Sequence, residues 1–262
     1  MKSADVLVTL KVAAQRAAAF MRPPRNQALT LETLMADARS TDIVQQFHKL
    51  WYASEAAGHV RWMGQPVLKS PFDLWVYQQI LVDCRPDVLI ETGTHRGGSA
   101  LYFSMIARLA GLNMDVVTID FNPKIAYDES AHRIHPIAGI STTSATLAKV
   151  EKFLRDRATS DRTPKVMVVL DSDHSMDNVL QELDMYAPLV TPGQYLVVED
   201  TNINGHPVLP EHGPGPHEAV EVFVSQHRDF HRDRTCERFL FTQNPGGWLK
   251  RDDPGSRQTR RP

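Results

Sequence analysis

The segment Asp87–Ser99 constrains most strongly what this chain can fold into. An apolar run, Val88 to Ile90, leads through Glu91 into a turn that holds three glycines. Apolar residues spaced three and four positions apart then predict a helix over 98–110. A strand, a glycine-rich turn and a helix in this order let the backbone approach a nucleotide-like ligand closely. The segment therefore predicts a nucleotide-binding α/β unit.

A second predicted strand, 115–120, ends in an acid, Asp120. An acid at this point can accept hydrogen bonds from both ribose hydroxyls of an adenosine. The glycines do not have the dinucleotide spacing G-x-G-x-x-G, and no Gly-Lys-Ser/Thr follows them as in a P-loop. The alternative is a tight strand-to-helix turn that binds no ligand.

Composition narrows the class of protein. The 262 residues suit one large α/β domain with an N-terminal extension. A net charge of −2 provides no basic field for nucleic acid, and no apolar run reaches the length of a membrane span. We therefore expect neither nucleic acid nor a membrane span. Two cysteines form no disulfide framework and no signal-peptide pattern is present, which favours a cytoplasmic location.

The predicted elements divide the chain into three parts. Residues 1–60 form a helical extension, with helices over 3–21 and 30–57, that we expect to act as an oligomer contact or a lid. The apolar positions of the second helix suit one buried face. Residues 61–250 form the main domain, and the polar residues 251–262 are predicted to be disordered.

Strands and helices alternate through the main domain. Strands are expected at 87–92, 115–120, 133–137, 165–171 and 194–199, and helices at 72–83, 98–110, 142–157, 175–187 and 217–228. Later short strands are expected near 229–235, 238–243 and 248–249. The runs 165–171 and 194–199 are almost continuously apolar, as is typical of strands buried on both faces of a parallel sheet. This order predicts an α/β fold with an open, mostly parallel sheet.

Acidic residues end the predicted strands. They are Glu91, Asp120, Asp171, Glu199 and Asp200. Because ligands bind beyond the carboxyl ends of such strands, we expect all five acids at one edge of the sheet. Like charges this close need a cation, and Asp171, Glu199 and Asp200 offer the hard oxygen ligands that suit Mg²⁺ or Ca²⁺. The alternative is that Asp171 caps the next helix and Glu199–Asp200 is a solvated strand end.

Histidines near this edge are candidates for a general base and for substrate contacts. His174 lies three residues past Asp171, where a neutral imidazole can take a proton, and Asp173 is a candidate to orient it. Three further histidines flank a Gly/Pro loop: His206, His212 and His217. No cysteine joins them and their spacing matches no zinc motif, so a substrate-covering loop is the better interpretation.

Four motifs taken together resemble a known family. They are Glu-Thr-Gly-Thr-x-x-Gly-Gly-Ser (91–99), Thr-Ile-Asp (118–120), Leu-Asp-x-Asp-His (170–174) and Pro-Gly-x-Tyr-x-x-Val-Glu-Asp (192–200). This order resembles the rhamnosyl O-methyltransferase and cephalosporin hydroxylase-like family of S-adenosylmethionine-dependent enzymes, over residues 60–250. The resemblance implies a Rossmann-like sheet of seven strands, mostly parallel, with an antiparallel C-terminal strand.

The resemblance also implies roles for single residues. Those expected to bind S-adenosylmethionine are Glu91, Gly93, Thr94, His95, Gly97, Ser99, Asp120, Ser141 and Asp171. Those expected to bind Mg²⁺ are Asp171, Glu199 and Asp200. His174 falls where the similar catechol methyltransferases keep a catalytic lysine, and it is expected to act with Asp171 in catalysis. The substrate candidates are Trp62, Asp173, His206 and His217.

The implied reaction is Mg²⁺-dependent transfer of a methyl group to a hydroxyl of a mannose- or rhamnose-type glycoside, in a polysaccharide or glycolipid. One alternative is a hydroxylase or methoxylation enzyme that tailors cephalosporin-type natural products. It would need iron held by two histidines and a carboxylate, and this edge offers one histidine. Another alternative is a non-catalytic nucleotide-binding scaffold. The N-terminal helices favour a homo-oligomer.

Overall fold

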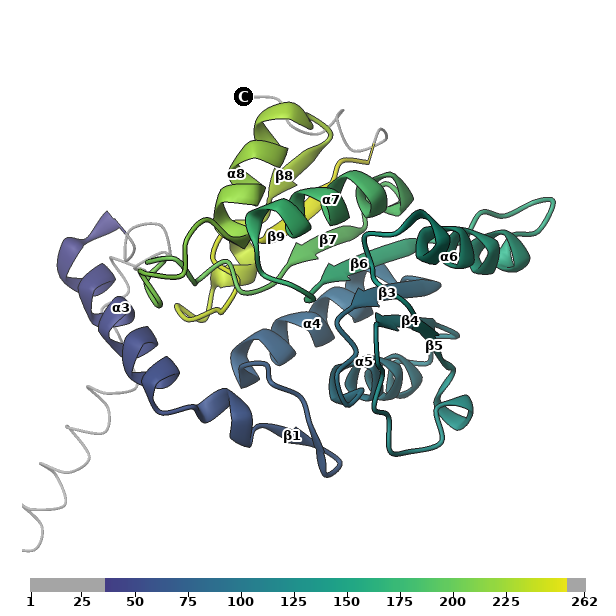
Figure 1. Cartoon of the computed structure of the whole chain (residues 1–262), viewed down its shortest axis with the longest axis horizontal. Helices are drawn as coiled ribbons and strands as arrows, with labels where there is room; N and C mark the ends of the chain where they lie inside the picture. Colours follow the sequence, from purple (N-terminus) through teal and green to yellow (C-terminus); the bar gives the residue numbers. More distant parts are fainter. Residues whose placement is uncertain (1–35, 254–262) are drawn as a thin grey trace, which may run out of the picture. The chain divides into compact units, whose positions relative to one another are not determined.

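The computed structural model describes residues 36–253, drawn in colour in Figure 1. The chain separates into two compact units, 1–44 and 45–262, and the second holds the sheet. The predicted helix over 3–21, the start of the one over 30–57 and the tail from 254 onward lie outside the described residues.

Seven strands of the second unit form one sheet in the order β5-β4-β3-β6-β7-β9-β8. They are β3 (Val88–Thr92), β4 (Asp115–Asp120), β5 (Ile134–Ala138), β6 (Val166–Leu170), β7 (Tyr195–Val198), β8 (Phe230–Arg232) and β9 (Trp248–Arg251). Neighbours from β5 to β7 pair in parallel, whereas β9 pairs antiparallel with β7 and with β8. The predicted fold class, including the antiparallel C-terminal strand, is confirmed.

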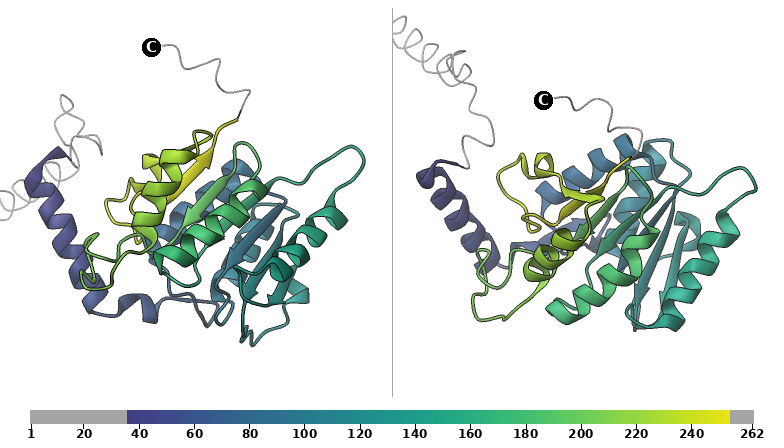
Figure 2. Two further views of the ribbon diagram at one scale, coloured as in Figure 1. Left: turned by 45° about the horizontal axis from the view of Figure 1, so that its top comes forward. Right: turned by 90° about the horizontal axis from the view of Figure 1, so that it is seen from above.

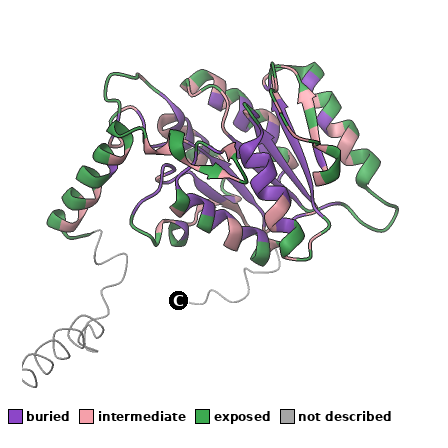
Figure 3. Cartoon of the chain, turned by 90° about the horizontal axis from the view of Figure 1, so that it is seen from below, coloured by how far each residue is buried: buried purple, intermediate pink, exposed green. Residues whose placement is uncertain are grey.

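Helices cover both faces of the sheet (Figure 2). They are α4 (Pro71–Cys84), α5 (Gly98–Leu109), α6 (Ser144–Arg157), α7 (Met176–Tyr186) and α8 (Pro216–Gln226). Successive side chains of a strand point to opposite faces, so Leu89 and Val116 pack with α4 and α5, while Ile90 and Val117 pack with α6, α7 and α8. All residues of β6 and β7 are buried, in line with the purple central strands of Figure 3, which explains the almost continuous apolar runs over 165–171 and 194–199.

A further α-helix, a hairpin and four 3₁₀ helices complete the described part of the chain. They are α3 (Ala38–Ala53), the hairpin strands β1 (Arg61–Trp62) and β2 (Gln65–Pro66), and the 3₁₀ helices η1 (Ala56–His59), η2 (Ser130–His132), η3 (Ala187–Leu189) and η4 (Arg234–Glu237). Among the described residues, no helix is both long enough and apolar enough to cross a bilayer.

The strand predicted near 238–243 is wrong. This segment is a loop that follows η4. Its polar groups hydrogen-bond to the buried carboxylate of Asp73 instead of to a neighbouring strand. Thr242 Oγ1 donates to Asp73 Oδ1 at 2.6 Å, and the Gln243 backbone N–H donates to Asp73 Oδ2 at 2.9 Å. The antiparallel strand is β9, which runs on to Arg251, one residue into the predicted tail.

The apolar face predicted for the second N-terminal helix is not buried as a whole. Phe47 and Leu50 of α3 are 42% and 68% exposed, respectively. The buried residue of α3 is His48. Its ring packs against Phe241 at a centroid distance of 4.6 Å, and its Nε2 lies 2.9 Å from the side-chain amide nitrogen of Asn202.

The stability of the fold is expected to fall with acid through His48. Desolvation by burial lowers the pKa of His48 to about 4. Between about pH 6.5 and 4 the unfolded chain binds a proton at this histidine that the folded chain does not bind, so stability rises with pH in this window. From pH 7 to pH 5 the free energy of unfolding should drop by about 2 kcal/mol through this residue alone. Urea unfolding at both pH values should show a smaller drop for His48→Gln than for wild type, and equal drops would contradict the prediction.

Candidate functional site

A cavity of about 640 Å³ opens at the carboxyl ends of the parallel strands. It lies where the strand order reverses between β3 and β6, which is where open α/β sheets bind ligands. The structure brings eight of the predicted site residues to this cavity: Gly93, His95, Asp120, Ser141, Asp171, Asp173, His174 and Asp200. We call it the cofactor cavity.

The glycine turn between β3 and α5 forms one wall of the cofactor cavity. Gly93 has a φ of +88°, and a Cβ at this position would lie 1.8 Å from the Asp171 carbonyl oxygen. Only glycine therefore allows β3 and the end of β6 to approach so closely. The next wall residue, His95, donates its backbone N–H to Asp120 Oδ2 at 2.8 Å.

Asp120 ends β4 with its carboxylate fixed by backbone donors. Oδ2 accepts from His95, and Oδ1 accepts from the Asn122 N–H at 2.8 Å. A carboxylate oxygen can accept a second hydrogen bond, so ribose hydroxyls remain acceptable partners. Phe121 and Ile140, which are 79% and 58% exposed, add apolar surface to the same cavity. Sequence reasoning missed Phe121, although an aromatic residue directly after a strand-ending acid was a usable signal.

Four predicted cofactor residues do not line the cavity. Glu91, Thr94, Gly97 and Ser99 lie behind the turn; Thr94 Oγ1 pairs with Thr118 Oγ1 at 2.7 Å, and the Gly97 carbonyl accepts from Tyr127 at 2.6 Å. Glu91 is fully buried, and burial raises its pKa to about 7. Its Oε2 accepts from Thr118, whereas Oε1 has no partner.

Asp171, His174 and Asp200 meet at one end of the cavity. One ligand atom from each lies within 4.8 Å of the others. His174 Nε2 is 3.5 Å from Asp171 Oδ1 and 3.3 Å from Asp200 Oδ2, and it is buried without a hydrogen-bond partner. The two hard carboxylate oxygens fit a divalent cation, and the imidazole nitrogen beside them is left without a hydrogen bond and is available for proton transfer. Burial alone lowers the pKa of His174, but the two neighbouring carboxylates outweigh it and raise the pKa to about 9.

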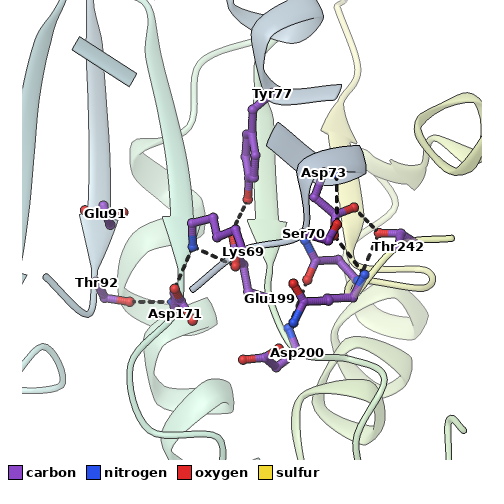
Figure 4. Close-up of polar contacts among 12 residues, drawn as sticks. Lys69, Ser70, Asp73, Tyr77, Glu91, Thr92, Asp171, Glu199, Asp200 and Thr242 are labelled. Atoms are coloured by element: carbon purple, nitrogen blue, oxygen red, sulfur yellow. Dashed lines mark hydrogen bonds and ion pairs between the residues drawn. The ribbon is translucent and has the colours of Figure 1, made fainter. Parts of the chain in front are cut away.

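Glu199 does not join these three residues. Its Oε2 accepts from Lys69 Nζ at 2.7 Å and its Oε1 accepts from the Tyr77 hydroxyl, as Figure 4 shows. The same Lys69 ammonium donates to Asp171 Oδ2 at 2.6 Å. Like Phe121, Lys69 and Tyr77 are site residues that sequence reasoning missed. The only sequence signal was the segment Lys-Ser-Pro-x-Asp (69–73), which contains Lys69 and leads into the helix α4 that carries Tyr77.

The contacts of Asp171 and Asp173 differ from two roles considered in the sequence analysis, a helix cap for Asp171 and the orientation of His174 for Asp173. Asp171 does not cap α7, because the N-cap residue is Ser175. Asp173 does not hydrogen-bond to His174; its Oδ1 accepts from the Ser175 backbone N–H at 2.9 Å and from the Ser175 hydroxyl. His174 is therefore positioned by Asp171 and Asp200 instead.

The other substrate candidates lie away from the cofactor cavity. Trp62 packs edge-on against Tyr102, at a ring-centroid distance of 5.0 Å. His206 and His217 stack at 3.6 Å, and His206 Nε2 lies 2.9 Å from Glu218 Oε1. The contacts of the two histidines attach the Gly/Pro loop to α8. Neither these histidines nor Trp62 line the cofactor cavity.

Comparison with known proteins gives concordant results. The model of the family described as Rhamnosyl O-methyltransferase/CmcI matches residues 54–252. The chain is 40% identical over 215 residues to a rhamnosyl O-methyltransferase of Mycobacterium tuberculosis (strain ATCC 25618 / H37Rv), which covers 81% of this chain and 86% of the relative. It is 39% identical over 216 residues to a rhamnosyl O-methyltransferase of Mycobacterium leprae (strain TN), with coverages of 81% and 93%.

Solved structures share the fold. The apo structure of CmcI-N160 superimposes with a TM-score of 0.57 at 22% identity, covering 75% of this chain and 77% of that chain. The structure of cmcI-D160 with Mg and SAM gives a TM-score of 0.56 at 21% identity, covering 75% and 78%.

Proposed function

Because this chain belongs to the rhamnosyl O-methyltransferase/CmcI family and is an S-adenosylmethionine-dependent O-methyltransferase, we propose that it methylates a sugar hydroxyl in a Mg²⁺-dependent reaction. The acceptor we propose is a rhamnose- or mannose-type glycoside, and the names of the mycobacterial relatives support the rhamnose type. The observation that carries the proposal is the meeting of Asp171, His174 and Asp200 on a cavity that also holds Asp120 and the glycine turn.

The cofactor cavity fits the donor. S-adenosylmethionine supplies a sulfonium methyl group that a nucleophile can displace. Asp120 would accept the ribose hydroxyls, and Phe121 and Ile140 would border the adenine together with Ser141. Gly93 and His95 would lie beside the methionine part. We retain Glu91, Thr94, Gly97 and Ser99 as residues that support this turn from behind, where Glu91 Oε1 is free to accept a hydrogen bond.

The carboxylates at the strand ends fit the cation. We define the acidic rim as Asp171, Glu199 and Asp200. Asp171 and Asp200 would hold Mg²⁺, together with Glu199 once its oxygens are released. Bound Mg²⁺ would supply Lewis acidity that lowers the pKa of a nearby sugar hydroxyl. His174 Nε2 takes the hydroxyl proton, and Asp171 and Asp200 stabilise the resulting imidazolium.

The remaining parts of the chain have proposed roles outside the chemistry. Asp173, which lines the cavity, is the substrate candidate with the best access to an acceptor. Trp62, His206 and His217 would act by holding the hairpin and the Gly/Pro loop in place. We propose residues 1–60 as an oligomer contact or lid and 61–250 as the catalytic domain.

We expect methyl transfer to require both the sugar and the metal. The protein should be incubated with isotopically labelled S-adenosylmethionine, Mg²⁺ and a panel of rhamnosides, mannosides and one catechol, and the products read by mass spectrometry. A rhamnoside or mannoside should gain a labelled methyl group. Exhaustive chelation should reduce the rate to background, and added Mg²⁺ should restore it.

Other outcomes of this experiment would contradict specific parts of the proposal. Methylation of the catechol alone would contradict the sugar assignment. An unchanged rate after chelation would contradict the role of Mg²⁺. A product that gains an oxygen atom instead of a methyl group would favour the hydroxylase alternative.

A further inference from the structure

Lys69 places a buried ammonium between two members of the acidic rim. The residue is 2% exposed, and its Nζ lies 2.6 Å from Asp171 Oδ2 and 2.7 Å from Glu199 Oε2. Figure 4 shows the ammonium on the side of Asp171 that faces β7 and Tyr77. The opposite oxygen, Asp171 Oδ1, faces His174. Asp171 is therefore shared between a resident cation and the candidate metal site.

The segment that carries Lys69 is fixed on both sides. Its preceding residue, Leu68, has a φ of +62° and lines the cofactor cavity. The following residue, Ser70, is the N-cap of α4, and its Oγ accepts from the Asp73 N–H at 3.1 Å. Asp73 is in turn held by Thr242. Because the backbone is anchored, movement of Lys69 is restricted to its four-carbon side chain, which is flexible in lysine.

The ammonium compensates the negative charge of Glu199, which forms no other ion pair among the described residues. Among the described residues, Lys69 is the only lysine or arginine that forms an ion pair with Asp171 or Glu199. Glu199 is buried, and both of its oxygens are occupied, by Lys69 and by Tyr77. Burying carboxylates without a nearby cation is strongly unfavourable, so this position needs a positive charge at all times.

We propose that Lys69 competes with the divalent cation for the acidic rim: its ammonium holds Asp171 and Glu199 in the metal-free protein and leaves Glu199 when the metal binds. The proposal rests on the magnesium dependence proposed above. Metal enters beside Asp171 Oδ1, His174 and Asp200, where ligand atoms already converge. Repulsion between the two cations on either side of Asp171 then favours departure of the ammonium, which frees Glu199 to complete the site.

Metal affinity measured by calorimetry tests the competition. Wild type, Lys69→Met and Lys69→Arg should be titrated with Mg²⁺ and with Mn²⁺ in the absence of substrate. Lys69→Met should bind either ion about tenfold more tightly or better, because the competitor is gone. Lys69→Arg should bind more weakly, because a guanidinium fork holds carboxylates more firmly. Lys152→Met is the matched control, since Lys152 pairs with Asp156 on the exposed side of α6, and it should bind as wild type does.

Thermal unfolding gives a second readout that needs no activity. Metal-free Lys69→Met should unfold at a lower temperature than metal-free wild type, and Mg²⁺ should raise its midpoint by more. If Lys69→Met does not fold, the weaker binding by Lys69→Arg still tests the competition. Unchanged or weaker Mg²⁺ binding by a folded Lys69→Met would overturn the proposal, whereas absence of binding by wild type would overturn the magnesium dependence itself.

Lys69→Met also removes a positive charge near the metal site, and this change by itself strengthens cation binding. The position of the Lys69 ammonium must therefore be observed directly. A crystal structure with Mn²⁺ should show Lys69 Nζ separated from Glu199 and a Glu199 oxygen on the ion. In the Lys69→Met background, Glu199→Gln should weaken metal binding again, because Glu199 is then a ligand. An ion bound beside an intact Lys69–Glu199 pair would overturn the proposal.

Discussion

Replacing Asp171 with asparagine is expected to slow methyl transfer by about a thousandfold, which corresponds to roughly 4 kcal/mol of lost transition-state stabilisation. Asp171 is the acid at which Lys69 and His174 meet, with Lys69 on Oδ2 and His174 near Oδ1. An asparagine has one oxygen and one amide NH₂, so it cannot present an acceptor oxygen to both Lys69 and His174. It also removes a negative charge from the candidate metal site.

Single-turnover rates with labelled S-adenosylmethionine measure this effect, and calorimetric binding of the same donor reports whether the cofactor cavity is intact. Asp177→Asn is a suitable control, because Asp177 is an exposed acid in the first turn of α7. The control should keep the wild-type rate within a few-fold. A wild-type rate for Asp171→Asn at saturating Mg²⁺ would remove Asp171 from the mechanism.

Replacing His174 with alanine is expected to leave a folded protein that is slower by a factor of about 10² to 10³ at neutral pH. The imidazole Nε2 is buried between Asp171 and Asp200 and forms no hydrogen bond that the fold needs. The difference in rate between His174→Ala and wild type should become smaller at high pH, because a sugar hydroxyl that is already ionised needs no base. A general base works only when it is neutral, and the two acids hold the pKa of His174 at about 9 before any cation lowers it.

The pH dependence of the rate distinguishes a base from a structural residue. The wild-type rate should rise with pH and level off by about pH 9, whereas the His174→Ala rate should continue to rise. His59→Ala, at an exposed histidine that ends η1, serves as the control and should follow the wild-type profile. A His174→Ala profile parallel to wild type across the whole range would assign His174 a role other than proton transfer.

Much of the candidate site was predictable because residues that end parallel strands must share one edge of the sheet. Asp120 at the end of β4, Asp171 after β6 and Asp200 after β7 follow from local apolar runs and topology alone. His174 follows from its place three residues past a strand end. No side-chain contact had to be known to place these residues together.

Lys69 and Tyr77 could not be placed in the same way. Lys69 reaches Asp171 across 102 sequence positions, and Tyr77 reaches Glu199 across 122. Both lie before the first strand of the main sheet, on a segment and helix whose packing depends on the finished fold. The predicted strand near 238–243 failed for a similar reason, because the buried Asp73 carboxylate takes its hydrogen bonds.

The contact between Gly93 and Asp171 ties the cofactor cavity to the candidate metal site. A missing Cβ lets the turn rest on the Asp171 carbonyl, and the Asp171 N–H also donates to Thr92 Oγ1 at 3.1 Å. Because the turn and the Asp171 backbone are in direct contact, we expect that any shift of the turn on binding the proposed donor would also displace the backbone of Asp171. We therefore expect the affinities for donor and ion to be linked: the factor by which bound donor changes the affinity for the ion would equal the factor by which bound ion changes the affinity for the donor.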